Sequence, residues 1–336
     1  MISVEGVTKR YGSVLAVEEL SFAVERGEVV GFLGPNGAGK TTTMKMITGT
    51  LQPDEGAVRL DGVPVAEDPI SAKRRIGYLP EANPLYDELL VSEYLDYVAD
   101  LRGLSPREAR SGVADAVDET ALGEVFYRPI ADCSKGFRQR IGLASAILHR
   151  PEVLILDEPT EGLDPNQRVE IRRLVGSLGR ERTVLLSTHV MQEVEATCSR
   201  LVILSQGRLA VQGSVQELLA TRSGGAQFVV EAEGEGVARA LADLIGVTSS
   251  SSEQIDGRTR VHLEASGDHE LRPAIFDLAR EQGWRLWELH LERASLEQVF
   301  RTLTAESDMS SQRDPHSNQE EVESCSGAWG QSRSES

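Results

Sequence analysis

Cysteine is scarce in this chain, which holds three among 336 residues, namely Cys133, Cys198 and Cys325. They are too few and too widely spaced for a disulfide framework or a zinc site, so a protein of a reducing cytoplasm is the simplest interpretation. The chain also lacks any run of about 18 apolar residues, and we therefore expect no transmembrane helix. Residues 1–5 show no basic segment leading into an apolar stretch, so we expect no signal peptide.

Basic residues are in the minority. Lysine and arginine together number 35, against 53 aspartates and glutamates, which gives a formal net charge of −18. This excess argues against a general nucleic-acid coat and against a binder of anionic membranes, because both need a basic surface. The net negative charge does not exclude a small, local basic pocket. The length and the 40% hydrophobic content predict a folded protein of two or three domains with a sizeable core.

Two α/β segments flank a helical one. From about 85 to 150, apolar residues recur at spacings of three and four, which is typical of helices, and Ser105 before a proline predicts a helix start. Residues 153–156 and 184–186 are aliphatic runs, as expected for parallel strands buried on both faces. In the first 60 residues we expect a helix at 40–51 and strands at 2–7, 15–24, 29–33 and 58–60.

The composition changes at residues 222–226, which read Arg-Ser-Gly-Gly-Ala and indicate a linker. Residues 227–304 predict a small α+β domain whose β-α-β-β-α-β order suggests a ferredoxin-like sandwich. A last helix is expected at 295–303. Residues 305–336 are rich in Ser, Glu and Gln and hold seven acidic and two basic residues, so we expect a disordered acidic tail. The elements expected in the small domain are strands at 227–231, 247–255, 260–265 and 286–291 and helices at 237–245 and 269–282.

One glycine-rich stretch fits the pattern G-x-x-x-x-G-K-[ST] and lies between an apolar run and a helical segment, the context that this phosphate-binding motif needs. Its glycines let successive backbone N–H groups face a phosphate, and the N-terminus of the following helix adds positive potential. Lys40 supplies a charge for the β- and γ-phosphates, and the Thr41 hydroxyl can bind Mg²⁺. The stretch consists of Gly34, Pro35, Asn36, Gly37, Ala38, Gly39, Lys40, Thr41 and Thr42.

Three further candidate residues follow apolar strands. Asp157 ends the run at 153–156, where a carboxylate suits a Mg²⁺ ligand, and Glu158 next to it could polarise the water that attacks a γ-phosphate. His189 follows the strand expected at 184–186. A lone histidine is usually a core or surface residue. Ligands bind at the carboxyl ends of parallel strands, however, so we expect His189 to contact the γ-phosphate.

In this order, the motifs of residues 1–222 resemble the nucleotide-binding subunit of ABC transporters. The resemblance implies an α/β P-loop NTPase fold, an ABC cassette with a RecA-like core, an antiparallel β subdomain and an α-helical signature subdomain at about 85–150, followed by a small α+β domain. It implies that Tyr11 stacks on adenine, that Glu158 is the catalytic carboxylate and that His189 is the switch histidine. The remaining matches are the D-loop, Gly162-Leu163-Asp164-Pro165, and the signature, Ser134-Lys135-Gly136-Phe137-Arg138-Gln139-Arg140.

Within that family the chain looks most like the type-2 exporter branch, particularly the gliding-motility-associated ATPases, through residues 76–86, 134–140 and 296–300. The signature departs from the usual Leu-Ser-Gly-Gly-Gln, but it retains Ser134 and Gly136, which are implied to contact the γ-phosphate held by a partner subunit. The family's Q-loop glutamine is replaced by Glu81. Its carboxylate keeps an oxygen for Mg²⁺ or water and adds a negative charge, and the alternative is that Glu81 faces solvent.

The resemblance implies an exporter subunit that hydrolyses ATP with Mg²⁺ held by Thr41, Asp157 and Glu81. The chain would pair head to tail with a second copy of itself or a homologous ATPase subunit, and ATP would lie between Lys40 of one subunit and Ser134 of the other. Integral membrane permease subunits would dock in the groove around 81–97, with the ATPase peripheral on the cytoplasmic face of the cell membrane. The alternatives are a soluble ABC ATPase acting in translation or DNA repair and a cassette that only switches; we expect no nucleic-acid partner.

Overall fold

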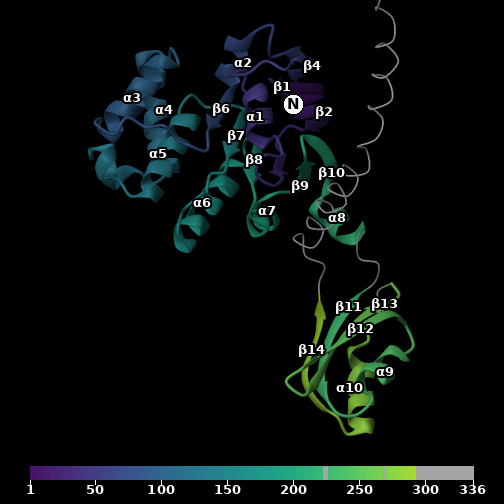
Figure 1. Cartoon of the computed structure of the whole chain (residues 1–336). Coiled ribbons are helices and arrows are strands. Elements are labelled where there is room, and N and C mark those ends of the chain that lie inside the picture. The colour runs from purple at the N-terminus through teal and green to yellow at the C-terminus, as the bar shows by residue number, and fades with distance from the viewer. Residues whose placement is uncertain (222–225, 268, 293–336) are drawn as a thin grey trace, which may run out of the picture.

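The computed structural model describes residues 1–221, 226–267 and 269–292. These residues form three sheets, two in the segment before residue 222 and one after residue 226 (Figure 1). Among the described helices, none combines the length and the apolar character needed to cross a bilayer. The helix predicted at 295–303 and the tail at 305–336 lie outside the described residues.

A six-stranded sheet carries the candidate residues. Its order is β10-β9-β3-β8-β7-β6, in which β9, β3, β8, β7 and β6 are parallel and β10 pairs antiparallel with β9. All residues of β7 and β8 are buried, as the aliphatic runs predict. The strands are β3 (Val29–Leu33), β6 (Ile76–Leu79), β7 (Val153–Asp157), β8 (Thr183–Thr188), β9 (Arg200–Ser205) and β10 (Arg208–Ser214).

Two hydrophobic cores lie on opposite faces of this sheet, and β7 supplies side chains to both. Leu154 and Leu156 belong to one core, and Val153 and Ile155 to the other, because side chains alternate along a strand. The second core is closed by α1 (Lys40–Ile47) and by an antiparallel sheet of order β2-β1-β4-β5. The strands of that sheet are β1 (Ile2–Tyr11), β2 (Val14–Val24), β4 (Glu55–Leu60) and β5 (Val63–Pro64).

The first core continues into a helical subdomain that lies to one side of the central sheet (Figure 1). The predicted start at Ser105 is confirmed: its Oγ accepts a hydrogen bond from the Glu108 N–H at 3.4 Å, and Glu108 Oε2 accepts one from the Ser105 N–H at 2.9 Å. The subdomain holds α3 (Val91–Leu101), α4 (Pro106–Glu119) and α5 (Lys135–Ile147) with short 3₁₀ turns at Gly123–Val125 and Ile130–Asp132; the remaining helices of the cassette are α2 (Pro69–Arg75), α6 (Pro165–Leu178), α7 (Met191–Thr197) and α8 (Val215–Thr221).

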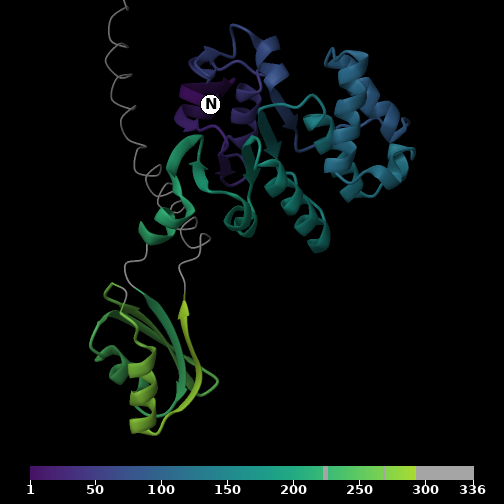
Figure 2. The same ribbon diagram turned by 180° about the vertical axis from the view of Figure 1, so that it is seen from behind.

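The C-terminal sheet is antiparallel with the order β12-β13-β11-β14, and its elements follow the predicted β-α-β-β-α-β order. Helices α9 and α10 pack on one face, where Val237 and Ile275 join the strand residues Phe228 and Val261 in a separate core (Figure 2). The domain limits 1–222 and 227–304 stay predictions. The elements are β11 (Gln227–Glu233), α9 (Val237–Ala242), β12 (Val247–Ile255), β13 (Arg258–Ala265), α10 (Arg272–Gln282) and β14 (Arg285–Glu292).

Several element ends differ from prediction. The helix expected at 40–51 ends at Ile47, because Gly49 adopts a left-handed φ of 66° that the helix cannot continue through. The helices expected at 237–245 and 269–282 cover Val237–Ala242 and Arg272–Gln282. The strand expected at 58–60 begins earlier, at Glu55.

Candidate functional site

The predicted phosphate loop connects β3 to α1. Its last residue, Gly39, is the N-cap of α1 with a left-handed φ of 96°, and no side chain caps the helix. A Cβ at this position would come within 2.6 Å of the Ala16 carbonyl oxygen, so only glycine fits. The first N–H groups of α1 therefore stay available to an anion.

Lys40 is 7% exposed and turns back over the phosphate loop. Its Nζ donates hydrogen bonds to the carbonyl oxygens of Gly34, at 2.8 Å, and Pro35, at 3.3 Å. The same Nζ lies 3.7 Å from Glu158 Oε1. The lysine charge is thus placed inside the loop, between the glycine-rich turn and the carboxylate after β7, where phosphate oxygens could replace its present partners.

Asp157 is the last residue of β7 and is fully buried. Its Oδ1 accepts a hydrogen bond from Ser187 Oγ at 2.5 Å, whereas Oδ2 has no partner. An unpartnered carboxylate oxygen in a buried position is costly unless a cation or water completes it. Thr41 and Glu81 line the same cavity of about 500 Å³ as Asp157. These hard oxygen donors fit Mg²⁺.

Glu158 follows β7 in a strained conformation, with a φ of 49°, and is 6% exposed. Its backbone N–H donates to Ser187 Oγ at 3.0 Å. Its Oε2 faces His189 Nδ1 at 2.9 Å. Burial raises the pKa of this carboxyl, while His189 and Lys40 act in the opposite direction. A buried carboxyl with a raised pKa beside a histidine has the features of a general base.

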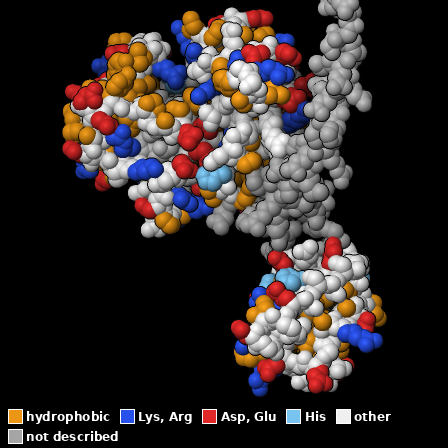
Figure 3. Space-filling model, in the orientation of Figure 1, with side chains coloured by type: hydrophobic (Ala, Val, Ile, Leu, Met, Phe, Trp, Pro, Cys, Tyr) orange, Lys and Arg blue, Asp and Glu red, His pale blue; other side chains and the backbone are white. Residues whose placement is uncertain are grey.

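His189 extends from the end of β8 and is half-exposed. Its Nδ1 faces Glu158, and its Nε2 lies 3.8 Å from Glu161 Oε2. The imidazole therefore lies between two carboxylates. Figure 3 shows acidic side chains gathered beside a histidine on this face of the cassette.

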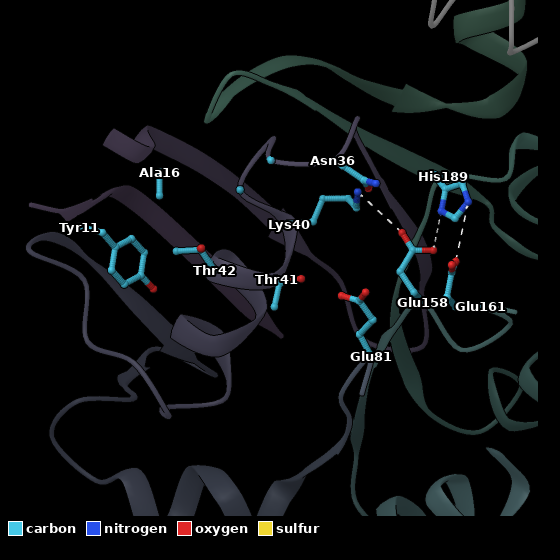
Figure 4. Close-up of a pocket in the computed structure, with 12 residues that line it drawn as sticks. Tyr11, Ala16, Asn36, Lys40, Thr41, Thr42, Glu81, Glu158, Glu161 and His189 are labelled. Carbon is cyan, nitrogen blue, oxygen red and sulfur yellow. Dashed lines mark hydrogen bonds and ion pairs between the residues drawn. The ribbon is translucent and has the colours of Figure 1, made fainter. Parts of the chain in front are cut away.

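A cavity of about 490 Å³ joins these parts. Tyr11 lies at one end of it and His189, Glu158 and Glu161 at the other, with Lys40, Thr41 and Thr42 between them (Figure 4). This size is within the usual range for small-molecule sites. Glu81 is exposed, yet it points toward the cavity near Thr41 (Figure 4). The cavity is lined by Tyr11, Ala16, Asn36, Gly37, Gly39, Lys40, Thr41, Thr42, Glu81, Glu158, Glu161 and His189.

The other predicted site residues lie outside this cavity within the described chain. Ser134 is the N-cap of α5 and accepts a hydrogen bond from the Phe137 N–H at 3.3 Å. Gly136 is packed so closely that a Cβ would come within 2.9 Å of the Gln167 side chain. Asp164 is the N-cap of α6 and accepts hydrogen bonds from the backbone N–H groups of Asn166 and Gln167, both at 3.0 Å.

Sequence reasoning missed three groups near the site. Ser187 holds Asp157 and the Glu158 N–H, and it could have been found because β7 and β8 are adjacent parallel strands whose ends coincide. Glu161 reaches His189 through a turn that no local pattern indicates. Tyr78 in β6 has a buried hydroxyl without a partner, and burial together with the charges of Asp157 and Glu81 raises its pKa to about 12.

Known proteins with similar sequences are ATP-binding proteins of ABC transporters and of antibiotic resistance. A family model described as "ABC transporter" matches residues 17–161. The linearmycin resistance ATP-binding protein LnrL of Bacillus subtilis (strain 168) is 31% identical over 307 residues, which cover 90% of this chain and 98% of that protein. The daunorubicin resistance ATP-binding protein DrrA3 of Streptomyces coeruleorubidus is 34% identical over 308 residues, which cover 91% of this chain and 96% of that protein.

A solved structure of the ATP-binding subunit of an ABC transporter matches with a TM-score of 0.60 and 32% identity, over 66% of this chain and 92% of that one. Because the match covers nearly the whole of that ATP-binding subunit, it confirms the predicted cassette fold. The two resistance proteins match beyond the cassette, along nearly their whole length. Likeness of that extent shows common descent rather than a shared local motif. The chain belongs to the family of ABC transporter ATP-binding subunits, which are ATP hydrolases.

Proposed function

We propose that this ABC ATPase binds one ATP in the 490 Å³ cavity, with the adenine on Tyr11 and the β- and γ-phosphates at Lys40 and the N-terminus of α1. The position of the phosphate loop at a helix start supports this orientation, because backbone N–H groups there attract anions. The other loop residues, except Pro35, would contribute their backbone N–H groups.

Mg²⁺ would be held by Thr41 and Asp157, with Glu81 as a further oxygen donor. When bound, the metal would neutralise charge on the phosphates. The unpartnered Oδ2 of Asp157 supports this assignment. Glu81, in place of the usual glutamine, adds a negative charge, so we expect nucleotide binding to depend more steeply on Mg²⁺ concentration.

For hydrolysis, Glu158 would orient the attacking water and accept its proton, since its carboxylate is buried and faces the phosphate end of the cavity. His189 would contact the γ-phosphate while its Nδ1 stays against Glu158 at 2.9 Å. The paired geometry of Glu158 and His189 is the single observation that carries the proposed catalytic roles.

We infer that the active unit is a head-to-tail pair, with a second copy or a homologous ATPase subunit. Ser134 and Gly136 lie outside the chain's own ATP cavity, at the start of α5. The N-terminus of that helix is an anion site in its own right. A second subunit would bring its α5 against the γ-phosphate, and loss of that phosphate on hydrolysis would release the pair.

A complementation experiment tests this arrangement. Lys40→Ala and Ser134→Ala should each abolish ATP turnover alone, and a mixture of the two should recover part of it, because a mixed pair holds one site with both residues intact. No recovery in a mixture that forms dimers would contradict the head-to-tail site. Chemical crosslinking measures the dimer content in the same samples.

Glu158→Gln tests the catalytic role. We expect turnover to fall by about 10²-fold or more, the scale of a lost general base, while ATP affinity is retained. Glu181→Gln, at an exposed position after α6, is the matched control. Equal turnover in the wild type and the Glu158 variant would show that Glu158 is not the base.

The permease partner would dock on the surface around α3. Tyr86 and Tyr97 are 49% and 42% exposed, and their rings meet edge to face with centroids 5.7 Å apart. Figure 3 shows hydrophobic side chains gathered over this side of the cassette. Tyr94 and Leu89, from the same predicted surface, instead pack into the core. Docking there would place the chain on the inner face of the membrane, and co-purification with a multi-span protein tests it.

Export is the direction that the named relatives support, because the two relatives named above, which match along nearly their whole length, are resistance proteins. We propose the type-2 exporter branch, and the likeness to gliding-motility-associated ATPases remains a prediction from residues 76–86 and 134–140. The net charge of −18 argues against a nucleic-acid partner.

A further inference from the structure

A buried carboxylate lies behind the catalytic pair. Glu193 in α7 is 2% exposed, and its Oε2 accepts hydrogen bonds from Thr160 Oγ1 at 2.8 Å and Thr188 Oγ1 at 3.0 Å. Its Oε1 has no partner. Burying a carboxylate that is held by neutral hydroxyls costs stability. Through its two hydrogen bonds, Glu193 connects the turn after β7 to the end of β8.

Each hydroxyl belongs to a segment next to a proposed catalytic residue: Thr160 lies in the turn after β7, and Thr188 is the last residue of β8. Thr160 lies two residues after Glu158, and Thr188 directly precedes His189. Thr188 Oγ1 also accepts a hydrogen bond from the Val190 N–H at 3.0 Å, which closes the turn around His189. Because both threonines are buried, at 4% and 0% exposure, these hydrogen bonds are shielded from water.

The contact between Glu158 and His189 joins the turn after β7 to the residue that follows β8. Glu158 has a left-handed backbone, which persists only where its surroundings fix it. Ser187 fixes it from the β8 strand end through the Glu158 N–H. Glu193 is the only side chain among the described residues that accepts hydrogen bonds from both Thr160 and Thr188.

We propose that Glu193 is a positioning residue that holds Glu158 and His189 at hydrogen-bond distance for ATP hydrolysis without contacting the nucleotide. The proposal rests on the catalytic roles given above to Glu158 and His189. Glu193 does not line the ATP cavity, and the phosphate loop makes none of its hydrogen bonds. Loss of its acceptor oxygen should therefore lower kcat and leave nucleotide affinity nearly unchanged.

The test compares two substitutions of similar volume. Glu193→Gln keeps an acceptor oxygen for both threonines, and Glu193→Met removes it. Because small displacements of reacting groups cost large factors in rate, we expect the Met variant to lose about tenfold to 10²-fold in kcat. The Gln variant should stay close to the wild type. Binding of a fluorescent ATP analogue should be retained in both, and wild-type kcat in the Met variant would overturn the proposal.

Thr188→Val probes the same link without opening a cavity. It should lower kcat in the wild-type background and have no further effect in a His189→Ala background, because both changes then act through one imidazole. Thr120→Val, which removes a buried hydroxyl hydrogen bond from α4 far from the site, controls for general destabilisation. If Thr188→Val lowered kcat by the same factor in both backgrounds, the proposal that this link acts by positioning His189 would be overturned. Undiminished turnover in His189→Ala alone would instead refute the role of that histidine.

Discussion

His149, in the turn just after α5, links pH to the stability of the cassette. One ring nitrogen, Nε2, lies 3.2 Å from the Ile76 carbonyl oxygen and donates to it, while Nδ1 is buried without a partner. Burial, assisted by the nearby Arg102 guanidinium, lowers the pKa of His149 from 6.5 to about 4. The folded protein thus keeps this imidazole neutral.

The size of the pH effect on the free energy of unfolding follows from the difference between the pKa of His149 in the folded and in the unfolded chain. The unfolded chain takes up a proton at His149 below about pH 6.5, whereas the folded chain does so only near pH 4. The contribution of the neutral His149 to stability is therefore fully present above pH 6.5, and it is lost as the pH falls from 6.5 towards 4. At about 1.4 kcal/mol per pKa unit, His149 accounts for a loss of about 3 kcal/mol in the free energy of unfolding.

The assay is urea unfolding at several pH values between 4 and 7.5 for the wild type and for His149→Gln. Glutamine can still donate a hydrogen bond to the Ile76 carbonyl but does not titrate, so the free-energy curve of the variant should be flatter across the window. Far-ultraviolet circular dichroism follows mainly the cassette, which holds most of the described helices. The described tryptophans, Trp284 and Trp287, lie in the C-terminal sheet domain and give a fluorescence control.

Parallel pH curves for the wild type and the variant in the dichroism signal would refute the reasoning, since the pH dependence would then come from other groups. A variant that flattens the dichroism and the tryptophan curves equally would also contradict it, because His149 belongs to the cassette alone. The two signals therefore separate a local effect from a change in the whole chain.

Three other substitutions test neighbouring parts of the structure. Gly39→Ala should abolish nucleotide binding in a fluorescent-analogue titration, because the left-handed backbone and the Ala16 carbonyl leave no room for a methyl group. Tyr78→Phe removes an unpartnered buried hydroxyl and should raise nucleotide-free stability by about 1 kcal/mol in thermal unfolding. Ser105→Ala should lower it by about 1 kcal/mol by removing the cap of α4, and an unchanged melting temperature would contradict the capping box.

The sequence predicted the site wherever local pattern determines geometry. The glycine-rich loop must precede a helix to present its N–H groups, and Asp157 and His189 follow aliphatic strands. Parallel strands end at one edge of a sheet, so these residues could be expected to meet. In the structure, Lys40 lies 3.7 Å from Glu158, and Glu158 lies 2.9 Å from His189. These residues, which are far apart in the sequence, meet because β3, β8 and β7 are neighbours in the sheet.

Helix ends and hydrogen-bond partners far apart in the chain were harder to predict from the sequence. The end of α1 at Ile47 depends on Gly49, a single left-handed residue, and periodicity alone extends the helix past it. Glu161, Ser187 and Glu193 contact Glu158, His189 or the residues beside them through turns and strand register, for which a one-dimensional pattern has no signal.

By itself, the sequence determined the chemistry of this protein: a phosphate loop, two carboxylates and a histidine, each next to a strand that the hydrophobic effect buries. Tertiary structure alone decided which groups share a hydrogen bond. It joined Thr160 and Thr188 to one buried carboxylate and left Ser134 outside the 490 Å³ cavity that Lys40 lines. The reason is physical, since burial depends on residue type, whereas hydrogen-bond partners depend on how strands far apart in the chain are ordered and aligned.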